Sequence, residues 1–543
     1  MSAPAPNNFQ APPPEGQMPF LPIDIVGSNE FGRYGKINLS QTYNMIISDN
    51  ALVPYAGYKN VLTLSALGTG RGIYASARGD ISIQVIGGTV YRIFPDLSFN
   101  AVGTLATSSG TVFIAENNND EIVISDGVNL YVYNYSGAGL FSISNITGGF
   151  SIDFHPGYLS FQNGRLMTAA TNATTGATSW RLSDFNNALS WPDDAQHVGV
   201  LQSKPDSVQA AVPFPGRGNM LFLFGKTVVE QWIDVGNPLF PYIRSSNFNV
   251  DYGCLNPATI AGLENLVVWL GGNEQSGPII MYSTGGSAQK LSNDGIDFKF
   301  SQLLNPENSF GFLFKQDGHL IYQITFFDDN LTYIYDFNTQ KFFTATDENL
   351  NHHIARKVIF FNNKYYFVAF NDGNLYEFGS KYTSFIYSST STLEIPRIRI
   401  CKPIRMVTQD NFIIKNLSFT VEQGQVNQID SFTFTGVNAN AITTENGYAI
   451  TAEDEIIIVT EPKLPSTTIT YLNPNMVVDL SISRNGGQSF GGSYRVGYNP
   501  TGDYRNKLDF WQLGLANDAT LQLRFYGFSR FVCFNGIVEI GTQ

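Results

Sequence analysis

Five histidines are the residues of this sequence best suited to acid–base or metal chemistry. His155, His197 and His319 stand singly beside predicted turns. His352 and His353 are adjacent, so on a strand their side chains would point to opposite faces. The sequence contains no HExxH, GxSxG or Walker A motif. Since these histidines do not form a set that converges on one site, we expect a protein that is not an enzyme and uses no metal or other cofactor.

Acidic residues form short local clusters that suit three kinds of chemistry. Two carboxylates about 5–10 Å apart can hydrolyse a glycoside. Grouped carboxylates can also bind calcium, although the sequence has no EF-hand loop. The clusters lie in turn-like, polar stretches, where solvated or channel-facing charge is the commoner role, and we favour that interpretation. The candidate channel residues are Asp328, Asp329, Glu453, Asp454 and Glu455.

A basic cluster occupies the stretch RIRICKPIR and consists of Arg397, Arg399, Lys402 and Arg405. On a strand, Arg397 and Arg399 share one face. Charges of this kind protect the edge of a sheet from pairing with another chain. They could also contact an acidic surface of a partner. The cluster is therefore a candidate partner interface.

The stretch Ser483–Phe490, with the sequence SRNGGQSF, matches an Asp-box-like hairpin. In such a turn the side chain of the third residue bonds turn amides. The box is not catalytic in the sialidases that carry it, and no motif here supplies a sialidase's arginine triad or Tyr–Glu pair. It therefore predicts a β-hairpin and not hydrolysis.

The composition favours strands and tight turns over long helices. The 543 residues include 51 Gly, and both the aromatic and the charged fractions are 14%. Short alternating strands recur around Gly turns, as at Asp126-Gly127, Asn163-Gly164 and Asp317-Gly318. Seven such hairpins recur about every 46 residues, which is the repeat length of propeller blades. We therefore expect an all-β chain with a degenerate β-propeller of six or seven blades. A run of meanders in stacked sheets would give the same hairpins.

Three regions are predicted along the chain. Residues 1–20 are Pro-rich and form either an unstructured tail or an extended arm that lies along a neighbouring subunit. Residues 21–385 form the propeller-like domain. Residues 386–543 alternate as strands of a β-sandwich-like domain, in which the polar stretch 427–470 is a projecting insertion.

Charge and cysteine content exclude several classes of protein. The net charge of −13 argues against a non-specific nucleic-acid binder. Cys254, Cys401 and Cys533 lie far apart, so we expect neither a disulfide framework nor a structural zinc site. No apolar run approaches the roughly 18 residues of a membrane span, and the first residues do not resemble a secretory signal.

The order of motifs along the chain resembles the packaged-DNA stabilisation, or tail hub, family of short-tailed bacteriophages. The resemblance rests on LSFQNGRLMTA, LFLFGKTVVEQWIDVGNP and DYGCLNPATIAGLENLVVWLGGNEQSGPIIMYS, followed by LSIS, Asn485-Gly486 and the late strand Leu521–Leu523–Phe525. It covers roughly residues 60–543. The Pro-rich arm and the stretch 427–470 depart from the family pattern.

The resemblance implies a structural protein of the virion tail, assembled in the cytoplasm of the bacterial host. Such proteins form a ring, usually of six copies, below the portal and its adaptor protein. They close the DNA exit channel and dock the tail needle, spikes or fibres. Double-stranded DNA passes without sequence-specific binding, which suits an acidic channel wall. No membrane segment is expected.

Two other functions remain open from the sequence. One is a receptor- or carbohydrate-binding adsorption protein, which would form a trimer with an exposed aromatic groove. A propeller glycosidase or depolymerase would need one of the acidic pairs as its catalytic groups.

Overall fold

The computed structural model describes residues 20–32, 40–64, 68–135, 140–142, 153–237, 239–406, 410–423, 477–498 and 505–542, together with four short strands between residues 430 and 471. The regular secondary structure of these residues is almost entirely β-strand, with one α-helix, α1 (Asp294–Phe300). Among them no helix is long and apolar enough to cross a membrane. The predicted all-β fold is confirmed.

Seven small antiparallel sheets, which we call blades 1 to 7, follow one another along the chain. Blade 1 contains β6 (Gly70–Ala75), β7 (Ser82–Ile86), β8 (Thr89–Ile93) and β9 (Phe99–Thr104), and blade 2 contains β10 (Phe113–Glu116), β11 (Glu121–Ser125), β12 (Leu130–Asn134) and β13 (Leu140–Ser142). Blade 3 contains β14 (Phe154–Gln162), β15 (Arg165–Asn172), β16 (Thr178–Leu182) and β17 (Val198–Gly199). Blade 4 contains β18 (Val208–Pro213), β19 (Met220–Gly225), β20 (Val229–Asp234) and β21 (Tyr242–Val250).

Blade 5 contains a short 3₁₀ helix, η2 (Pro257–Thr259), between its strands β22 and β23. Its strands are β22 (Gly253–Cys254), β23 (Ala261–Leu263), β24 (Leu266–Gly272), β25 (Ile279–Ser283) and β26 (Gln289–Lys290). Blade 6 contains β27 (Ser309–Gln316), β28 (His319–Phe326), β29 (Leu331–Asp336) and β30 (Lys341–Thr344). Blade 7 contains β31 (Ala355–Phe361), β32 (Lys364–Ala369), β33 (Leu375–Gly379) and β5 (Gly57–Leu62).

The blades close into a ring between blade 7 and blade 1. The first strands of blades 1 to 4 contact one another in turn, and so do those of blades 6, 7 and 1, where β31 contacts β6. Blade 5 joins the ring through contacts of β22 with β19 and of β23 and η2 with β27. Blade 7 takes its fourth strand from the N-terminal side of the ring, because β33 pairs with β5 and places Phe378 opposite Tyr58. The N-terminal and C-terminal strands of the propeller are thereby hydrogen-bonded to each other within one blade. The predicted propeller is confirmed, with seven blades.

Tight turns place the two longest hairpins as predicted. Asn163 and Gly164, between β14 and β15, have φ angles of 48° and 81°. Asp317 and Gly318, between β27 and β28, have φ angles of 48° and 90°. Two successive positive φ angles are what a type I′ turn requires, and asparagine, aspartate and glycine tolerate them best.

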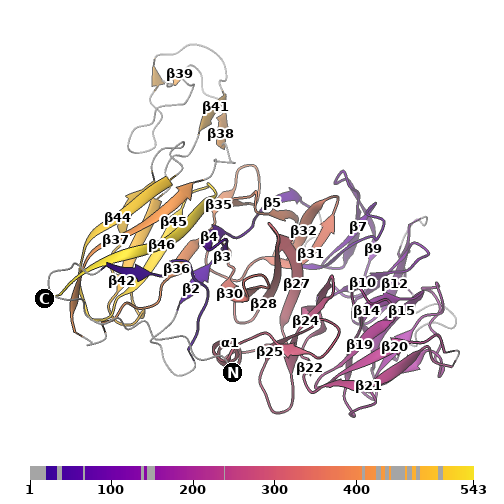
Figure 1. Cartoon of the computed structure of the whole chain (residues 1–543). Coiled ribbons are helices and arrows are strands. Elements are labelled where there is room, and N and C mark those ends of the chain that lie inside the picture. Colours follow the sequence, from indigo (N-terminus) through magenta and orange to yellow (C-terminus); the bar gives the residue numbers. More distant parts are fainter. Residues whose placement is uncertain are drawn as a thin grey trace.

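A β-sandwich follows the propeller and is also confirmed (Figure 1). Its core lies between two sheets and includes Leu417, Leu480, Leu523 and Val538, all fully buried. The outer sheet contains β1 (Phe20–Ile23), β3 (Met45–Ser48), β4 (Ala51–Pro54), β46 (Phe531–Thr542), β37 (Phe412–Gln423) and β44 (Arg505–Ala516). The inner sheet contains β2 (Gln41–Tyr43), β36 (Arg397–Ile400), β45 (Thr520–Tyr526), β42 (Val477–Ser483) and β43 (Tyr494–Gly497).

Strands from both ends of the chain build this sandwich. The sequence analysis assigned residues 21–385 to the propeller, yet β1 pairs with β46 and Leu52 of β4 lies opposite Cys533. These pairings join residues about 500 positions apart, so no local pattern in the sequence reveals them.

The propeller and the inner sheet are continuous. Tyr43 of β2 pairs in parallel with Thr344 of β30, and on its other side β2 pairs with β36. Blade 6 therefore extends into a nine-stranded sheet. Blade 7 extends in a similar way through β34 (Ser384–Ile386) and β35 (Thr392–Glu394).

Four further strands belong to the stretch 427–470 or lie next to it. They pair as β38 (Asp430–Thr433) with β41 (Thr468–Tyr471), and as β39 (Asn440–Ala441) with β40 (Val459–Thr460). Figure 1 shows β38, β39 and β41 beyond one end of the sandwich strands. The remainder of 427–470 lies outside the described residues.

Candidate assembly surfaces

Two arginines of the predicted partner interface lie inside the chain. Arg397 and Arg399 on β36 are 0% and 1% exposed. Arg399 donates from Nε to the carbonyl oxygen of Ile25 at 2.7 Å and from Nη1 to Ser40 Oγ at 2.6 Å. Arg397 donates from Nη2 to the carbonyl oxygen of Thr383 at 2.7 Å. Burial lowers the pKa of Arg397 to about 10 and also lowers that of Arg399, and both stay protonated at neutral pH.

This position differs from the surface cluster that the sequence analysis expected. The inner sheet is covered on both faces at β36, and the carbonyl and hydroxyl oxygens that surround the two guanidinium groups replace water. Their acceptors include residues of the N-terminal segment and of the propeller exit. Arg397 and Arg399 therefore hold the propeller and the sandwich together, and a partner cannot reach their guanidinium groups in the folded chain.

The other two basic residues are partly exposed and paired. Lys402 Nζ lies 2.7 Å from Glu30 Oε2, and Arg405 Nε lies 3.1 Å from Asp518 Oδ2. Such exposed pairs contribute little to stability because water and salt screen them. Lys402 and Arg405 thus remain partly accessible to a partner.

The predicted acidic residues divide between the described and undescribed parts of the chain. Asp328 is exposed and accepts hydrogen bonds from the side-chain amides of Asn305 and Asn308, both at 2.9 Å. Asp329 Oδ1 accepts the N–H of Leu304 at 2.9 Å. Both carboxylates therefore fix the loop that follows α1. The other cluster, Glu453, Asp454 and Glu455, lies outside the described residues.

One histidine stands in a series with a serine and an aspartate. His319 Nε2 lies 3.1 Å from Ser48 Oγ, and His319 Nδ1 lies 2.9 Å from the buried Asp336 Oδ2. The order matches a nucleophile, a base and an orienting carboxylate. Asp336 also accepts bonds from Asn338 and Thr339 in its own turn. Since the series connects blade 6 to the β3–β4 hairpin, the contacts support a structural role.

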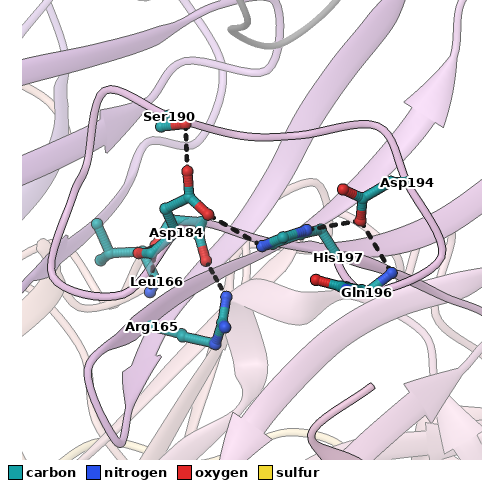
Figure 2. A network of polar contacts seen from close by, with 8 residues as sticks. Arg165, Leu166, Asp184, Ser190, Asp194, Gln196 and His197 are labelled. Carbon is teal, nitrogen blue, oxygen red and sulfur yellow. Dashed lines mark hydrogen bonds and ion pairs between the residues drawn. The ribbon is translucent and has the colours of Figure 1, made fainter. Parts of the chain in front are cut away.

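A second histidine closes a long excursion of blade 3. Figure 2 shows His197 between two carboxylates, with Nε2 3.1 Å from Asp184 Oδ1 and Nδ1 2.7 Å from Asp194 Oδ1. Ser190 Oγ donates to Asp184 Oδ2 at 2.5 Å. The hydrogen bond to His197 is the main cause that lowers the pKa of Asp194. The network ties the start of the loop 183–197 to its end.

Metal and thiol chemistry finds little support in the described part of the chain. No group of three or more His, Cys, Asp or Glu side chains there is placed to hold a metal ion. The three cysteines are free and buried. Burial raises the pKa of the Cys254 thiol to about 12, which disfavours the reactive thiolate.

The outer sheet of the sandwich presents an apolar face to solvent. We call this the outer-sheet face, and its large apolar residues are between 36% and 63% exposed: Phe20, Ile413, Trp511, Leu515 and Ile537. They come from all four strands of the row β1, β46, β37 and β44. Large exposed apolar patches mark sites of protein–protein contact.

The register shows that these side chains share one face. Ile413 lies directly opposite Leu515. Phe20 and Trp511 lie at the two ends of one row, since Phe20 pairs with Glu539, Glu539 with Asn416, and Asn416 with Trp511. This face was not among the sites predicted from the sequence. Its signal is that apolar residues occupy both parities of the strands, as in FII at 412–414 and FW at 510–511.

Comparison with known proteins identifies the propeller. The family model described as "Bacteriophage P22 Gp10, beta-propeller" matches residues 29–383, which is more than half of the chain. No curated protein sequence matches.

Similar solved structures include the N-terminal domain of Nup159, with 11% identity and a TM-score of 0.38 over 63% of this chain and 99% of that one. Another is virginiamycin B lyase from Staphylococcus aureus, with 11% identity and a TM-score of 0.41 over 60% of this chain and 99% of that one. Both likenesses are too distant to carry an argument about function. The family match confirms the resemblance found in the sequence and implies assembly with other virion proteins. The chain therefore belongs to the bacteriophage stabilisation family typified by P22 Gp10, and its role is that of a structural protein of the phage virion.

Proposed function

We propose that this protein is the tail hub of a short-tailed bacteriophage. Six copies form a ring below the portal and its adaptor protein, close the DNA exit channel after packaging, and dock the tail needle, spikes or fibres. The observation that carries the proposal is the combination of a family-typical propeller with a second domain that offers an apolar outer-sheet face. Trp511 is 61% exposed on this sheet, and a large apolar side chain exposed within such a patch marks a contact surface.

The occupant of the outer-sheet face is a second copy of this chain. Phe20, the first described residue, lies on that face, and the Pro-rich residues 1–19 precede it directly. Proline-rich segments lose little conformational entropy when they lie extended on a partner. We therefore assign the arm 1–19 of one copy to the outer-sheet face of its neighbour in the ring.

Charge is consistent with the passage of DNA. The net charge of −13 disfavours adhesion of the phosphate backbone, so DNA would slide through the ring. Asp328 is exposed, and Glu453, Asp454 and Glu455 add a further acidic run. We propose that these acidic side chains face the channel, and that Lys402 and Arg405 lie toward an adjacent tail protein.

The proposal is tested first by locating the protein on purified particles. Antibody label at a single vertex directly below the head supports the hub. Label on fibres or spikes contradicts it and favours an adsorption protein, for which polysaccharide binding is then assayed.

A matched pair of variants tests the assembly surface. Trp511→Ser should leave the fold of the isolated chain unchanged but reduce its incorporation into particles. Leu239→Ser serves as the control, because Leu239 is 72% exposed between β20 and β21 of blade 4 and is not part of the outer-sheet face. Equal incorporation of the two variants would show that the outer-sheet face is not an assembly surface.

A further inference from the structure

A small cavity lies where the first strands of the blades converge. Its volume is about 50 Å³, and its lining comes from β6, β10, β14, η2, β27 and β31. We call it the axial cavity. Phe113, Tyr158 and Phe310 supply aromatic walls. Because these elements belong to blades 1, 2, 3, 5, 6 and 7, any group bound there touches most of the ring at once.

Three cationic side chains line the axial cavity, and no aspartate or glutamate does. They are Arg71 from β6 and the consecutive residues Arg356 and Lys357 from β31. A register shift between Ala355 and Lys357 interrupts the alternation of the strand, so both neighbours line the same cavity. This concentration of positive charge stands in a chain whose net charge is −13.

The two arginines are held in place by neutral acceptors. Arg71 is 1% exposed and donates to the carbonyl oxygens of Gly87 and Gly110, both at 2.9 Å. Arg356 donates to the Thr111 hydroxyl at 3.0 Å and lies over the Phe310 ring, 5.6 Å from its centroid. Neither guanidinium group has an ion-pair partner among the described residues. Asp126 attracts Arg71 at longer range but does not line the cavity.

Lys357 has the fewest contacts of the three. Its ammonium group makes no hydrogen bond or ion pair with any described residue. Its surroundings exclude enough water to lower the pKa of the ammonium group, and the pKa of Arg356 falls to about 10 because of burial and the nearby Arg71 charge. Unpaired cations in a partly dry site are costly until an anion neutralises them.

We propose that the axial cavity binds one small oxyanion of the size of inorganic phosphate, with Lys357 and Arg356 as its principal ligands. A volume of about 50 Å³ admits such an ion, whereas nucleotides and sugars need pockets of several hundred Å³. The phosphates of passing DNA cannot enter either, since they are bound within a duplex. The ligand is therefore a free ion.

Binding would strengthen the closure of the ring. Arg356 and Lys357 belong to blade 7, and Arg71 belongs to blade 1, which are the blades at the closing point. Arg356 Nη1 already donates across this boundary to the carbonyl oxygen of Gly70 at 3.3 Å. An oxyanion bound between the cations replaces their mutual repulsion with attraction, so it favours the closed ring.

Calorimetric titration of the full chain with inorganic phosphate tests the site. We expect one phosphate per chain, with a dissociation constant in or below the millimolar range. Lys357→Met should weaken binding at least tenfold, the effect of one lost charge-assisted hydrogen bond. The control, Lys341→Met, removes an exposed lysine of β30 and should change binding by less than about twofold.

Thermal unfolding provides a second readout that works even if Lys357→Met binds too weakly to titrate. Phosphate raises the melting temperature of many proteins non-specifically, so the comparison is between variants at equal ionic strength. The wild type and Lys341→Met should gain more from phosphate than Lys357→Met does. Equal gains in all three proteins, the absence of a titratable site in the wild type, or equal binding of chloride would overturn the proposal.

Discussion

Arg399 Nε donates a hydrogen bond of 2.7 Å to the carbonyl oxygen of Ile25, a residue 374 positions earlier in the chain. Ile25 follows β1 of the outer sheet, and Arg399 lies in the inner sheet that continues into blade 6. One buried cation thus joins the segment after β1 to the inner sheet, which is continuous with blade 6. We call this contact the joint, and we expect the position of the sandwich relative to the propeller to depend on it.

Replacement of Arg399 by methionine should destabilise the chain strongly. Methionine fills part of the space but leaves the oxygens of Ile25, Ser40 and Asp24 without a donor. A buried polar group that loses its partner costs about 1–3 kcal/mol, so the loss of stability should amount to several kcal/mol. Chemical denaturation followed by tryptophan fluorescence measures the change.

Lys402→Met is the matched control for this measurement. The substitution also removes one positive charge from the same segment. Because the pair of Lys402 with Glu30 is partly exposed, the loss of folding free energy should stay below about 1 kcal/mol. If the two variants proved equally stable, Arg399 would not be the joint.

Stability should fall with acid because of one buried histidine. His353 is 1% exposed, and its Nδ1 accepts the N–H of Ala355 at 3.2 Å and an amide of Gln323 at 3.3 Å. Burial lowers its pKa from 6.5 to about 3. Below pH 6.5 the imidazole is protonated in the unfolded chain but stays neutral in the folded chain, so stability is lost as the pH falls from 6.5 toward 3. At pH 5 the loss is about 2 kcal/mol.

His353→Asn should remove this acid dependence. An asparagine side-chain oxygen can take the place of Nδ1 as acceptor, and it does not titrate. Denaturation curves at pH 7 and pH 5 should then differ less for the variant than for the wild type, even if the variant is less stable at both. An unchanged difference would mean that other groups cause the acid sensitivity.

Local chemistry in the sequence predicts the hairpins, whereas distant pairing does not show in it. Asn163-Gly164 and Asp317-Gly318 form the expected tight turns, because their φ angles are a property of those residues. In the predicted Asp-box, Asn485 Oδ1 accepts the N–H of Ser489 at 3.0 Å, as expected. The closing pair Phe378–Tyr58 joins strands more than 300 residues apart, and nothing near either residue indicates it.

The candidate site was harder to predict because burial of charge depends on the same distant pairing. An arginine on an alternating strand is normally placed toward water. Arg397 and Arg399 become buried only because the N-terminal segment supplies carbonyl and hydroxyl acceptors around them. Lys357 is a similar case, since only ring closure brings it near Arg71.

Removal of residues 1–19 should leave folding intact and weaken assembly. The first contacts to the sandwich begin with β1, where Phe20 pairs with Glu539 and Ile23 enters the core. Thermal unfolding of this truncation should match the full chain, while analytical ultracentrifugation or incorporation into particles should show weaker association.

A longer truncation separates the two roles. Removal of residues 1–23 also deletes the buried side chain of Ile23 from the core, which should lower the stability by about 2 kcal/mol. If the shorter truncation lowered stability by the same amount, residues 1–19 would serve the fold and not assembly.

The His197 network should control the order of one propeller loop without affecting the ring. His197→Gln keeps a polar side chain but cannot contact Asp184 and Asp194 together, so the loop 183–197 loses the tie between its two ends. Hydrogen exchange of that loop should rise about tenfold or more, the effect of losing about 1.4 kcal/mol of local stability, while exchange in blade 7 stays unchanged.

The hydrogen bond from His197 lowers the pKa of Asp194, so the contribution of the folded carboxylate is present above its ordinary pKa and is lost as the pH falls below it. The wild-type loop should therefore exchange faster in acid than at neutral pH after correction for intrinsic rates, and the variant should show less of this dependence. Faster exchange throughout the propeller of His197→Gln would instead place the network in the global core.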